Sequence, residues 1–394
     1  MPPGRLLLAI ALLVIAFNMR PVFASLSPVL PELMATLGIT PASASLLTTG
    51  PVLCLGIFAL AAPGLAVRVG TERTLLAALL ALSTGTALRG IASFPAVVAG
   101  SLLAGIGIAV VNVLLPSLVK RDFADRAALM TGSYSMVMCA GAALAAGVTV
   151  PLSRVVDGAG AALAAWSLPA LAAALVWAAV GLRRAPASRP VGEVVSAGRL
   201  WRERLAWDVA LFMGSQSALA YCVFGWMAPI LRERGADPVT AGLLVSVSIL
   251  VQAPASFLAP QIAARFADVR PFAVLLIALA AGGLLGVILA PLPTAWLWVV
   301  LQGLGQGALF SMTMTFIIQR SPDARTVASL SGMAQGVGYA LAGSGPLFVG
   351  LIRDRAGSFG PAAYLVGSIT AVAVLAAFGA GRNRLLPSVV RPAA

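Results

Sequence analysis

The chain has 394 residues, of which 60% are hydrophobic and only 10% are charged, and its mean hydropathy is +0.99. Soluble proteins carry about 25% charged residues, so this composition excludes a soluble multidomain enzyme as well as a disordered chain. Basic residues exceed acidic ones by 13. The chain has no His, and its three Cys lie in apolar stretches without CxxC spacing. We therefore expect no metal site, no disulfide framework and no cofactor.

Apolar segments between charges and turns predict twelve membrane-spanning helices, because a span needs about 20 mostly apolar residues. The first apolar run contains Arg20 and Pro21 and nothing after it reads as a soluble protein, which favours a span over a signal peptide. The sequence thus predicts an all-α integral membrane protein. Its spans are expected at 6–33, 41–66, 74–93, 96–118, 127–150, 160–181, 208–231, 239–263, 271–290, 294–318, 327–350 and 360–380.

The positions of the basic residues predict the orientation of these spans. If the N-terminus is cytoplasmic, nineteen Arg and Lys fall on the cytoplasmic side and six, among them Arg89, on the opposite side. Basic loops mark the cytoplasmic face, so both termini are expected in the cytoplasm. The basic excess then follows from topology, and no nucleic-acid partner is expected.

A long Arg-rich segment, 182–207, separates spans six and seven and predicts a cytoplasmic linker between two six-helix halves, 1–181 and 208–394. The halves match each other when the sequence is shifted by about 197 residues. A parallel repeat of this kind indicates two bundles related by an axis along the membrane normal, with a site between them. The matched pairs include Pro41 with Pro238, Pro63 with Pro260, Arg68 with Arg265, Gly105 with Gly303 and Gly107 with Gly305.

Twelve spans, a central loop and the basic turn PGLAVRVGTER at 63–73 resemble the major facilitator superfamily. The family signature in this turn is G-x-x-x-D-R-x-G-R-R; Arg68 and Gly70 match it, whereas Pro63 and Val67 replace its Gly and Asp. The strings Asn18-Met19-Arg20-Pro21 and SLSPVLPEL resemble the cyanate and 2-nitroimidazole transporter group within that family. The resemblance implies two pseudo-symmetric six-helix bundles that transport by alternating access. It also implies a monomer in a bacterial inner membrane.

Arg20 is the outstanding residue because it lies inside a span. It follows Arg5 by fifteen residues, or about 22 Å of helix, which places it past the membrane midplane. The acidic residues all fall in turns or near span ends. A buried unpaired cation costs several kcal/mol, and an anionic substrate in a water-filled cavity would offset that cost. The alternative is an arginine bonded to backbone carbonyls or Gln side chains for packing.

Further polar residues inside the spans form the predicted pocket. Amides also hold membrane helices together, so packing is the alternative for each of them. With Arg20, the candidate substrate-binding residues are Asn18, Asn112, Tyr134, Gln216, Tyr221, Gln302, Gln306, Gln335 and Tyr339.

Charged residues at matching cytoplasmic turns predict an inner gate whose ion pairs break as the halves rock. Solvated loop charge is the alternative. The candidate gate residues are Arg68, Arg121, Asp125, Arg126, Arg265, Arg320, Asp323 and Arg325.

The sequence therefore predicts a transporter, not an enzyme, since no nucleophile–base pair, metal cluster or phosphate loop is visible. Its expected cargo is a small anionic or polar solute, cyanate-like or another small organic anion, bound near Arg20. The alternative is an exporter of neutral or anionic drug-like compounds with the same fold. Exporters of lipophilic cations usually use an acid within the membrane, and no span carries one at mid-depth.

Overall fold

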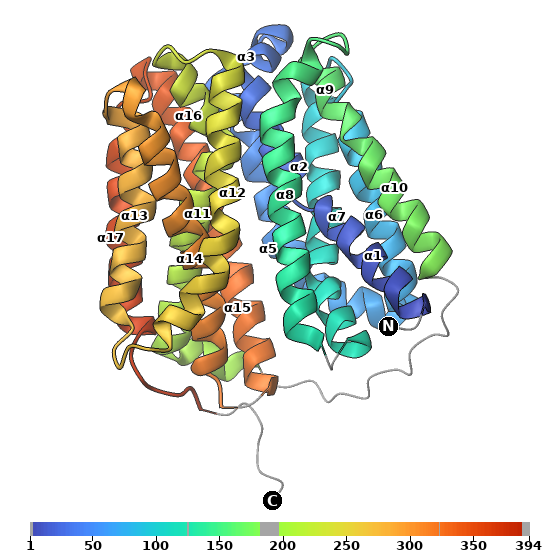
Figure 1. The fold of residues 1–394 in the computed structure, drawn as a ribbon, viewed down its shortest axis with the longest axis vertical. Coiled ribbons are helices and arrows are strands. Elements are labelled where there is room, and N and C mark those ends of the chain that lie inside the picture. Colours follow the sequence, from blue (N-terminus) through green and yellow to red (C-terminus); the bar gives the residue numbers. More distant parts are fainter. Residues whose placement is uncertain (1–2, 124–125, 182–196, 323, 388–394) are drawn as a thin grey trace, which may run out of the picture.

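The computed structural model describes residues 3–123, 126–181, 197–322 and 324–387, and within these it is helical without strands. Figure 1 shows its helices running roughly side by side in two groups, α1 to α10 and α11 to α17. The helices of the first group are α1 (Pro3–Phe17), α2 (Pro21–Ala24), α3 (Leu26–Leu37), α4 (Pro41–Ala44), α5 (Leu46–Val69), α6 (Thr71–Leu88), α7 (Phe94–Asp122), α8 (Ala127–Ser153), α9 (Ala159–Ala165) and α10 (Ser167–Val180). Those of the second group are α11 (Arg204–Glu233), α12 (Pro238–Ala263), α13 (Arg270–Leu289), α14 (Ala295–Gln319), α15 (Ala324–Ala342), α16 (Ser344–Ala356) and α17 (Ala362–Ala380), preceded by the 3₁₀ turn η2 (Ala197–Arg202).

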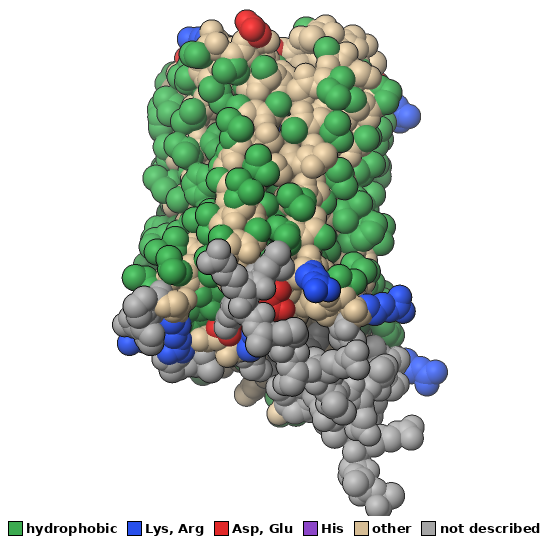
Figure 2. All heavy atoms as spheres, turned by 90° about the vertical axis from the view of Figure 1, so that its right-hand side faces the viewer, with side chains coloured by type: hydrophobic (Ala, Val, Ile, Leu, Met, Phe, Trp, Pro, Cys, Tyr) green, Lys and Arg blue, Asp and Glu red, His purple; other side chains and the backbone are tan. Residues whose placement is uncertain are grey.

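Each of the twelve predicted spans is helical in the structure, and four of them are divided. The first span consists of α1, α2 and α3, the second of α4 and α5, the sixth of α9 and α10, and the eleventh of α15 and α16. In the described part of the chain, nine helical stretches are long and apolar enough to cross a membrane by themselves. Figure 2 shows hydrophobic side chains over the middle of one face, with charged side chains toward its ends, as expected for a surface that faces lipid.

The predicted repeat is visible in the helix packing. A Cβ on Gly105 of α7 would lie 2.7 Å from Pro51 of α5, and a Cβ on Gly303 of α14 would clash with Ser248 of α12. Pro51 and Ser248 are themselves 197 residues apart, and Gly105 and Gly303 are 198 apart, so both pairs follow the shift of about 197 residues. Each half thus uses a glycine to bring its fourth span against its second.

The same repeat appears at the turns before the second span of each half. Gly38 and Gly235 both have positive φ, 63° and 100°, which glycine adopts without strain. Two residues later Thr40 and Asp237 cap the next helix by accepting backbone hydrogen bonds. The expected boundaries of the halves, 1–181 and 208–394, stay a prediction, and most of the expected linker, 182–196, lies outside the described residues.

The hydrophobic cores show where the two halves meet. Two cores lie inside single halves, one formed by residues between 8 and 177 and one by residues between 200 and 386. The first of these cores reaches the helix end near Arg121, and the second reaches the helix end near Arg320. We call the end of the molecule that carries these two arginines the basic end. The third core combines residues of both halves, such as Leu30 and Trp226, and lies at the opposite end. The halves are therefore joined by apolar packing mainly at the end opposite the basic end.

Candidate functional site

The first span is interrupted at the residue that the sequence singled out. α1 ends at Phe17, and Arg20 is the N-cap of the one-turn helix α2, with φ −114° and ψ −20°. Pro21 fits the first position of α2 because that position needs no N–H donor. Pro31, inside α3, removes a further helical hydrogen bond. Irregular backbone at membrane depth is tolerated where it lines a cavity or is buried in protein.

The Arg20 side chain leaves this break toward both halves of the molecule. Its Nη1 lies 3.5 Å from Sγ of Cys139 in α8. Its Cζ lies 5.9 Å from the ring centroid of Phe310 in α14, within the range of a cation–π contact. The guanidinium is thus placed where α2, α8 and α14 converge.

A cavity of about 80 Å³ surrounds this position. A cavity needs only about 10–15 Å³ by this measure to hold one water molecule, so it can hold a solute of a few heavy atoms. Arg20 carries the only charge among its lining residues, and none of these described residues is Asp or Glu. The lining comprises Met19, Arg20, Phe23, Leu55, Ile108, Asn112, Met138, Gln216, Ser217, Ala220, Tyr221, Phe224, Gln252, Gln306, Phe310 and Tyr339.

Aromatic rings from both halves form much of the cavity wall. The rings of Phe23 and Tyr221 lie 5.3 Å apart, and those of Tyr221 and Phe224 lie 6.0 Å apart. Tyr221 also meets Tyr339 edge-on at 6.3 Å. Such tilted and edge-on pairs are favourable for aromatic side chains, and the cluster brings α2, α11 and α15 together at the cavity.

The amides of the cavity fall into two classes. Nε2 of Gln306 donates to both O and Oε1 of Gln216 at 3.0 Å, and Nε2 of Gln216 donates to the Ser217 hydroxyl at 2.8 Å. These two amides link α11 to α14. The Asn112 and Gln252 amides, by contrast, make no hydrogen bond within the described residues, and neither do the hydroxyls of Tyr221 and Tyr339. The second class is therefore available to a solute.

Six of the ten predicted binding residues line this cavity: Arg20, Asn112, Gln216, Tyr221, Gln306 and Tyr339. The other four do not line it. Asn18 donates to Val14 O at 2.8 Å, because the turn at the helix break directs its amide back to α1. Gln335 donates to the Ser331 hydroxyl at 2.8 Å, one turn back on α15.

Gln302 and Tyr134 complete the set outside the cavity. Gln302 is fully buried and accepts a hydrogen bond from the Ser248 hydroxyl, so it joins α14 to α12. Tyr134 lies one turn before the cavity residue Met138 on α8 and packs against the core of the first half. Gln302 and Tyr134 thus make helix-packing contacts in this structure, which is the alternative that the sequence left open for them.

Sequence reasoning missed the apolar part of the site. Phe224, Phe310 and Met138 line the cavity, but in spans that are apolar on all sides nothing distinguishes such residues from core or lipid-facing ones. One sequence signal could have identified Phe224: it lies three residues after the candidate Tyr221, and residues three apart share a helix face.

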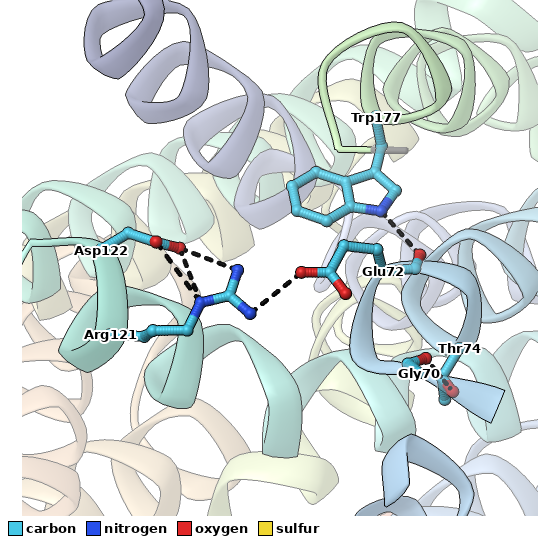
Figure 3. A network of polar contacts seen from close by, with 6 residues as sticks. All are labelled: Gly70, Glu72, Thr74, Arg121, Asp122 and Trp177. Atoms are coloured by element: carbon cyan, nitrogen blue, oxygen red, sulfur yellow. Dashed lines mark hydrogen bonds and ion pairs between the residues drawn. The ribbon is translucent and has the colours of Figure 1, made fainter. Parts of the chain in front are cut away.

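Two of the predicted gate residues, Arg121 and Arg320, make contacts inside single halves. Arg121 pairs with Glu72 of α6 at 2.9 Å and with its neighbour Asp122 at 3.1 Å, next to the turn at Gly70 (Figure 3). Trp177 of α10 donates to Glu72 O at 3.0 Å, which ties this turn to the same half (Figure 3). Arg121 thus links α6 to α7 within the first half.

Arg320 has the corresponding position in the second half. Its guanidinium donates to the carbonyls of Ala380 at 2.9 Å and Gly381 at 3.3 Å, and so caps the end of α17. Within the described part of the chain, Arg68 and Arg265 make no ion pair or hydrogen bond with the other half. Arg68, Arg126 and Arg265 are exposed, and Asp125 and Asp323 lie outside the described residues. Arg325 is the second residue of α15, and its side chain likewise lies outside the described part.

At the end opposite the basic end, described residues of the two halves make polar contacts with each other. Glu32 of α3 pairs with Arg232 of α11 at 2.7 Å, and the Ser27 hydroxyl accepts a hydrogen bond from Ala228 N at 3.1 Å. These contacts lie in the region where the halves share a hydrophobic core.

Comparison with known proteins agrees with this architecture. The family profile described as "Major Facilitator Superfamily" matches residues 6–230 and 210–392. The 2-nitroimidazole transporter of Escherichia coli (strain K12) is 36% identical over 384 residues, 97% of this chain and 97% of that protein. The cyanate transport protein CynX of the same organism is 30% identical over 351 residues, 89% of this chain and 91% of that protein.

The fold also resembles solved transporter structures. A bacterial homolog of the human lysosomal transporter Spinster, in an inward-facing and unoccupied conformation, superposes with a TM-score of 0.75 at 17% identity. That superposition covers 98% of this chain and 100% of the other. At this identity the similarity establishes the fold alone.

Proposed function

The chain belongs to the Major Facilitator Superfamily, and from this premise we propose that it carries a small anion bound at Arg20 between two six-helix halves. It is a multi-pass membrane transporter and not an enzyme. The observation that carries the proposal is the cavity itself, because Arg20 is the only charged residue among the described residues that line it. Burying a cation without an anion is unfavourable, and a bound anion removes that cost.

The guanidinium has the chemistry that such a cargo requires. It presents donors in a planar fork that matches carboxylates and other planar anions, and it is more weakly hydrated than an ammonium group. Cys139 and Phe310 contact it without neutralising it. The volume of about 80 Å³ favours an anion of a few heavy atoms. The cyanate carried by one relative, according to its name, is of this size.

The site is divided between the halves, which supports alternating access. Arg20 and Asn112 come from the first half, whereas Tyr221, Gln252 and Tyr339 come from the second. A solute that forms hydrogen bonds with residues of both halves favours the conformation in which the two halves are close together at the cavity. The shared core at one end and the separate cores at the basic end are the arrangement expected of a state closed at one end.

We further propose the topology expected from the charges. The basic end faces the cytoplasm of a bacterial cell, with both termini there, and the halves 1–181 and 208–394 rock as bundles joined by the linker 182–207. The chain works as a monomer in this scheme. The arginines at helix ends of the basic end, such as Arg121 and Arg320, support this orientation, because basic residues mark the cytoplasmic side of membrane proteins.

A second candidate function is export of neutral or anionic drug-like compounds. The aromatic wall supports it, because rings such as Phe23, Tyr221 and Phe224 offer stacking surfaces to an aromatic cargo. A relative named for 2-nitroimidazole, an aromatic compound, points the same way.

The test is uptake of radiolabelled cyanate and of 2-nitroimidazole into proteoliposomes, for wild type, Arg20→Ala and Arg20→Lys. We expect saturable cyanate uptake in wild type, none in Arg20→Ala, and a weakened affinity in Arg20→Lys, which keeps the charge but loses the fork. Arg154→Ala, an exposed arginine at the end of α8, is the control and should transport normally. Equal cyanate uptake by Arg20→Ala would overturn the anion site. Transport of 2-nitroimidazole alone would favour the second function.

A further inference from the structure

Arg89 is counted with the loop arginines in the sequence, but the structure buries it. Its exposed fraction is 1%, and it is among the largest fully buried side chains of the molecule. The residue is the C-cap of α6, with φ −67° and ψ −14°. A buried arginine without an acidic partner is costly, and none of the ion pairs among the described residues includes Arg89.

The contact that Arg89 makes leads to the functional site. Its Nη1 donates to Val22 O in α2 at 2.9 Å, whereas its Nε and Nη2 have no partner within the described residues. Val22 lies between Arg20, the N-cap of α2, and Phe23, which lines the cavity. A single hydrogen bond therefore joins a buried cation to the segment that carries the proposed anion-binding residue.

We propose that Arg89 is a positioning residue that holds α2 in place and, through it, presents Arg20 to the anion; this rests on the function proposed above. A helix of one turn is not stable by itself, because nucleation costs more than one turn of hydrogen bonds returns. α2 spans four residues between the break at Arg20 and the bend at Ser25. Its position must therefore be set by neighbours, and Arg89 supplies a charged donor to its backbone.

The backbone of Arg89 is fixed on two sides, which makes this side chain a rigid connection. A Cβ on Gly100 of α7 would lie 3.3 Å from Arg89 N, and one on Gly160 of α9 would lie 3.6 Å from Arg89 O. Next to it, a Cβ on Gly90 would lie 2.7 Å from Ala164. α7 and α9 thus determine where the guanidinium can reach.

The other half joins its corresponding spans in the opposite direction. There Arg234, at the end of α11, donates to the carbonyls of Val287 and Ala290 at the end of α13. In both halves an arginine therefore connects the first span to the third. Only in the first half does that arginine arise from the third span and reach the interrupted helix beside the cavity.

The energetics separate a positioning role from a merely structural one. Replacing buried charged groups by apolar side chains of similar volume is often neutral or stabilising when no partner charge is left behind, and Arg89 has no acidic partner among the described residues. Arg89→Met should therefore fold as well as wild type or better. If Arg89 serves the site, the same variant must lose anion affinity although it loses no stability.

The experiment compares Arg89→Met with Arg154→Met in the full-length protein. Arg154 is also a helix C-cap, at the end of α8, with φ −83° and ψ −18°, but it is exposed. Amide hydrogen exchange of a peptide covering 18–26 reports on α2 without any substrate. Thermal midpoints and the KM and kcat of cyanate uptake complete the comparison.

We expect exchange in 18–26 to rise about tenfold in Arg89→Met, with the rest of the chain and the thermal midpoint unchanged, as for loss of one charged hydrogen bond. KM should rise about tenfold while kcat stays within about twofold. Arg154→Met should match wild type in every readout. Unchanged exchange, or faster exchange throughout the first half with a lower midpoint, would overturn the proposal. If wild-type uptake depends on Arg20 but Arg89→Met has the same KM as wild type, the proposal is also overturned. If wild type carries no anion, the proposed function fails, and the exchange data still decide whether Arg89 holds α2.

Discussion

Gly141 of α8 packs directly against the carbonyl oxygen of Phe17, the last residue of α1. A Cβ at position 141 would clash with that oxygen and would lie 3.2 Å from the Phe17 ring. The carbonyl belongs to the helix break, so α8 closes over the turn that leads to Arg20. Only a residue without a side chain permits this approach.

Gly141→Ala should therefore disturb the break. The added methyl group must move α1 or α8, and overpacking of this kind typically costs about 1–3 kcal/mol. We expect a lower thermal midpoint and reduced anion uptake. Gly147→Ala on the same helix is the control, because its nearest neighbour, the Ser246 hydroxyl, lies at 3.4 Å, an ordinary contact. Equal behaviour of the two variants would contradict this packing argument.

Chemical modification of Cys139 should depend on whether an anion is bound at Arg20, because Sγ of Cys139 lies 3.5 Å from Nη1 of Arg20. A small methanethiosulfonate reagent that modifies Cys139 places a bulky group beside the guanidinium and should block uptake. Cyanate should slow the inhibition, since a bound anion occupies the same space. The measurement is the inhibition rate with and without cyanate in a Cys54→Ser, Cys222→Ser background. Cys139→Ser in that background should be insensitive; inhibition of that variant would show that the reagent acts elsewhere.

The pair of Glu32 and Arg232 should hold the end opposite the basic end closed. Exposed pairs contribute at most about 1 kcal/mol, which corresponds to about a fivefold change in an equilibrium. Arg232→Gln should thus speed labelling of a cysteine introduced at Ser217, from that end, by up to about fivefold. Arg353→Gln is the matched control: it breaks a 2.7 Å pair with Glu233, which lies within one half. Equal acceleration by both variants would mean that the Glu32 pair has no special role in closure.

Asp237 should make stability depend on pH at the start of α12. Hydrogen bonds from the Thr240 side chain and backbone, and from Val239 N, lower the pKa of its carboxyl below the ordinary value of 3.8. A carboxyl with a lowered pKa stabilises the folded state above its unfolded pKa and loses this effect as the pH falls through the folded value. Thermal midpoints between pH 7 and pH 3 should fall less in Asp237→Asn than in wild type. A parallel decline in both proteins would argue against this residue as the source.

Much of the fold could be predicted because its signals are local in the chain. Hydropathy places the spans, and each of the twelve expected ranges is helical. Gly105 and Gly303 could be paired from sequence, and the structure shows that they serve the same packing. The only sequence signal for the breaks at Asn18–Arg20 and Ser25 was proline. Proline weakens a helix, but it does not determine at which residue the helix ends.

The site was harder to predict because it depends on how each helix is rotated. Gln302 and Gln306 share a face of α14 in the sequence, yet Gln306 lines the cavity and Gln302 is bonded to α12. Four residues separate them, which is one turn and about 6 Å along the axis, enough to exchange one set of neighbours for another. In helices that are apolar on all sides, periodicity alone does not reveal which stripe faces the cavity.

The sequence by itself determined that this is a twelve-span membrane protein with a repeat, a basic end and one arginine inside a span, since composition, hydropathy and charge are properties of the chain in order. Only the tertiary structure decided what surrounds that arginine: that α1 stops before Arg20, that rings of both halves enclose it, and that Arg89 reaches Val22 behind it. Those relations join residues far apart in the chain, and they exist only once packing has fixed which groups lie within hydrogen-bonding distance.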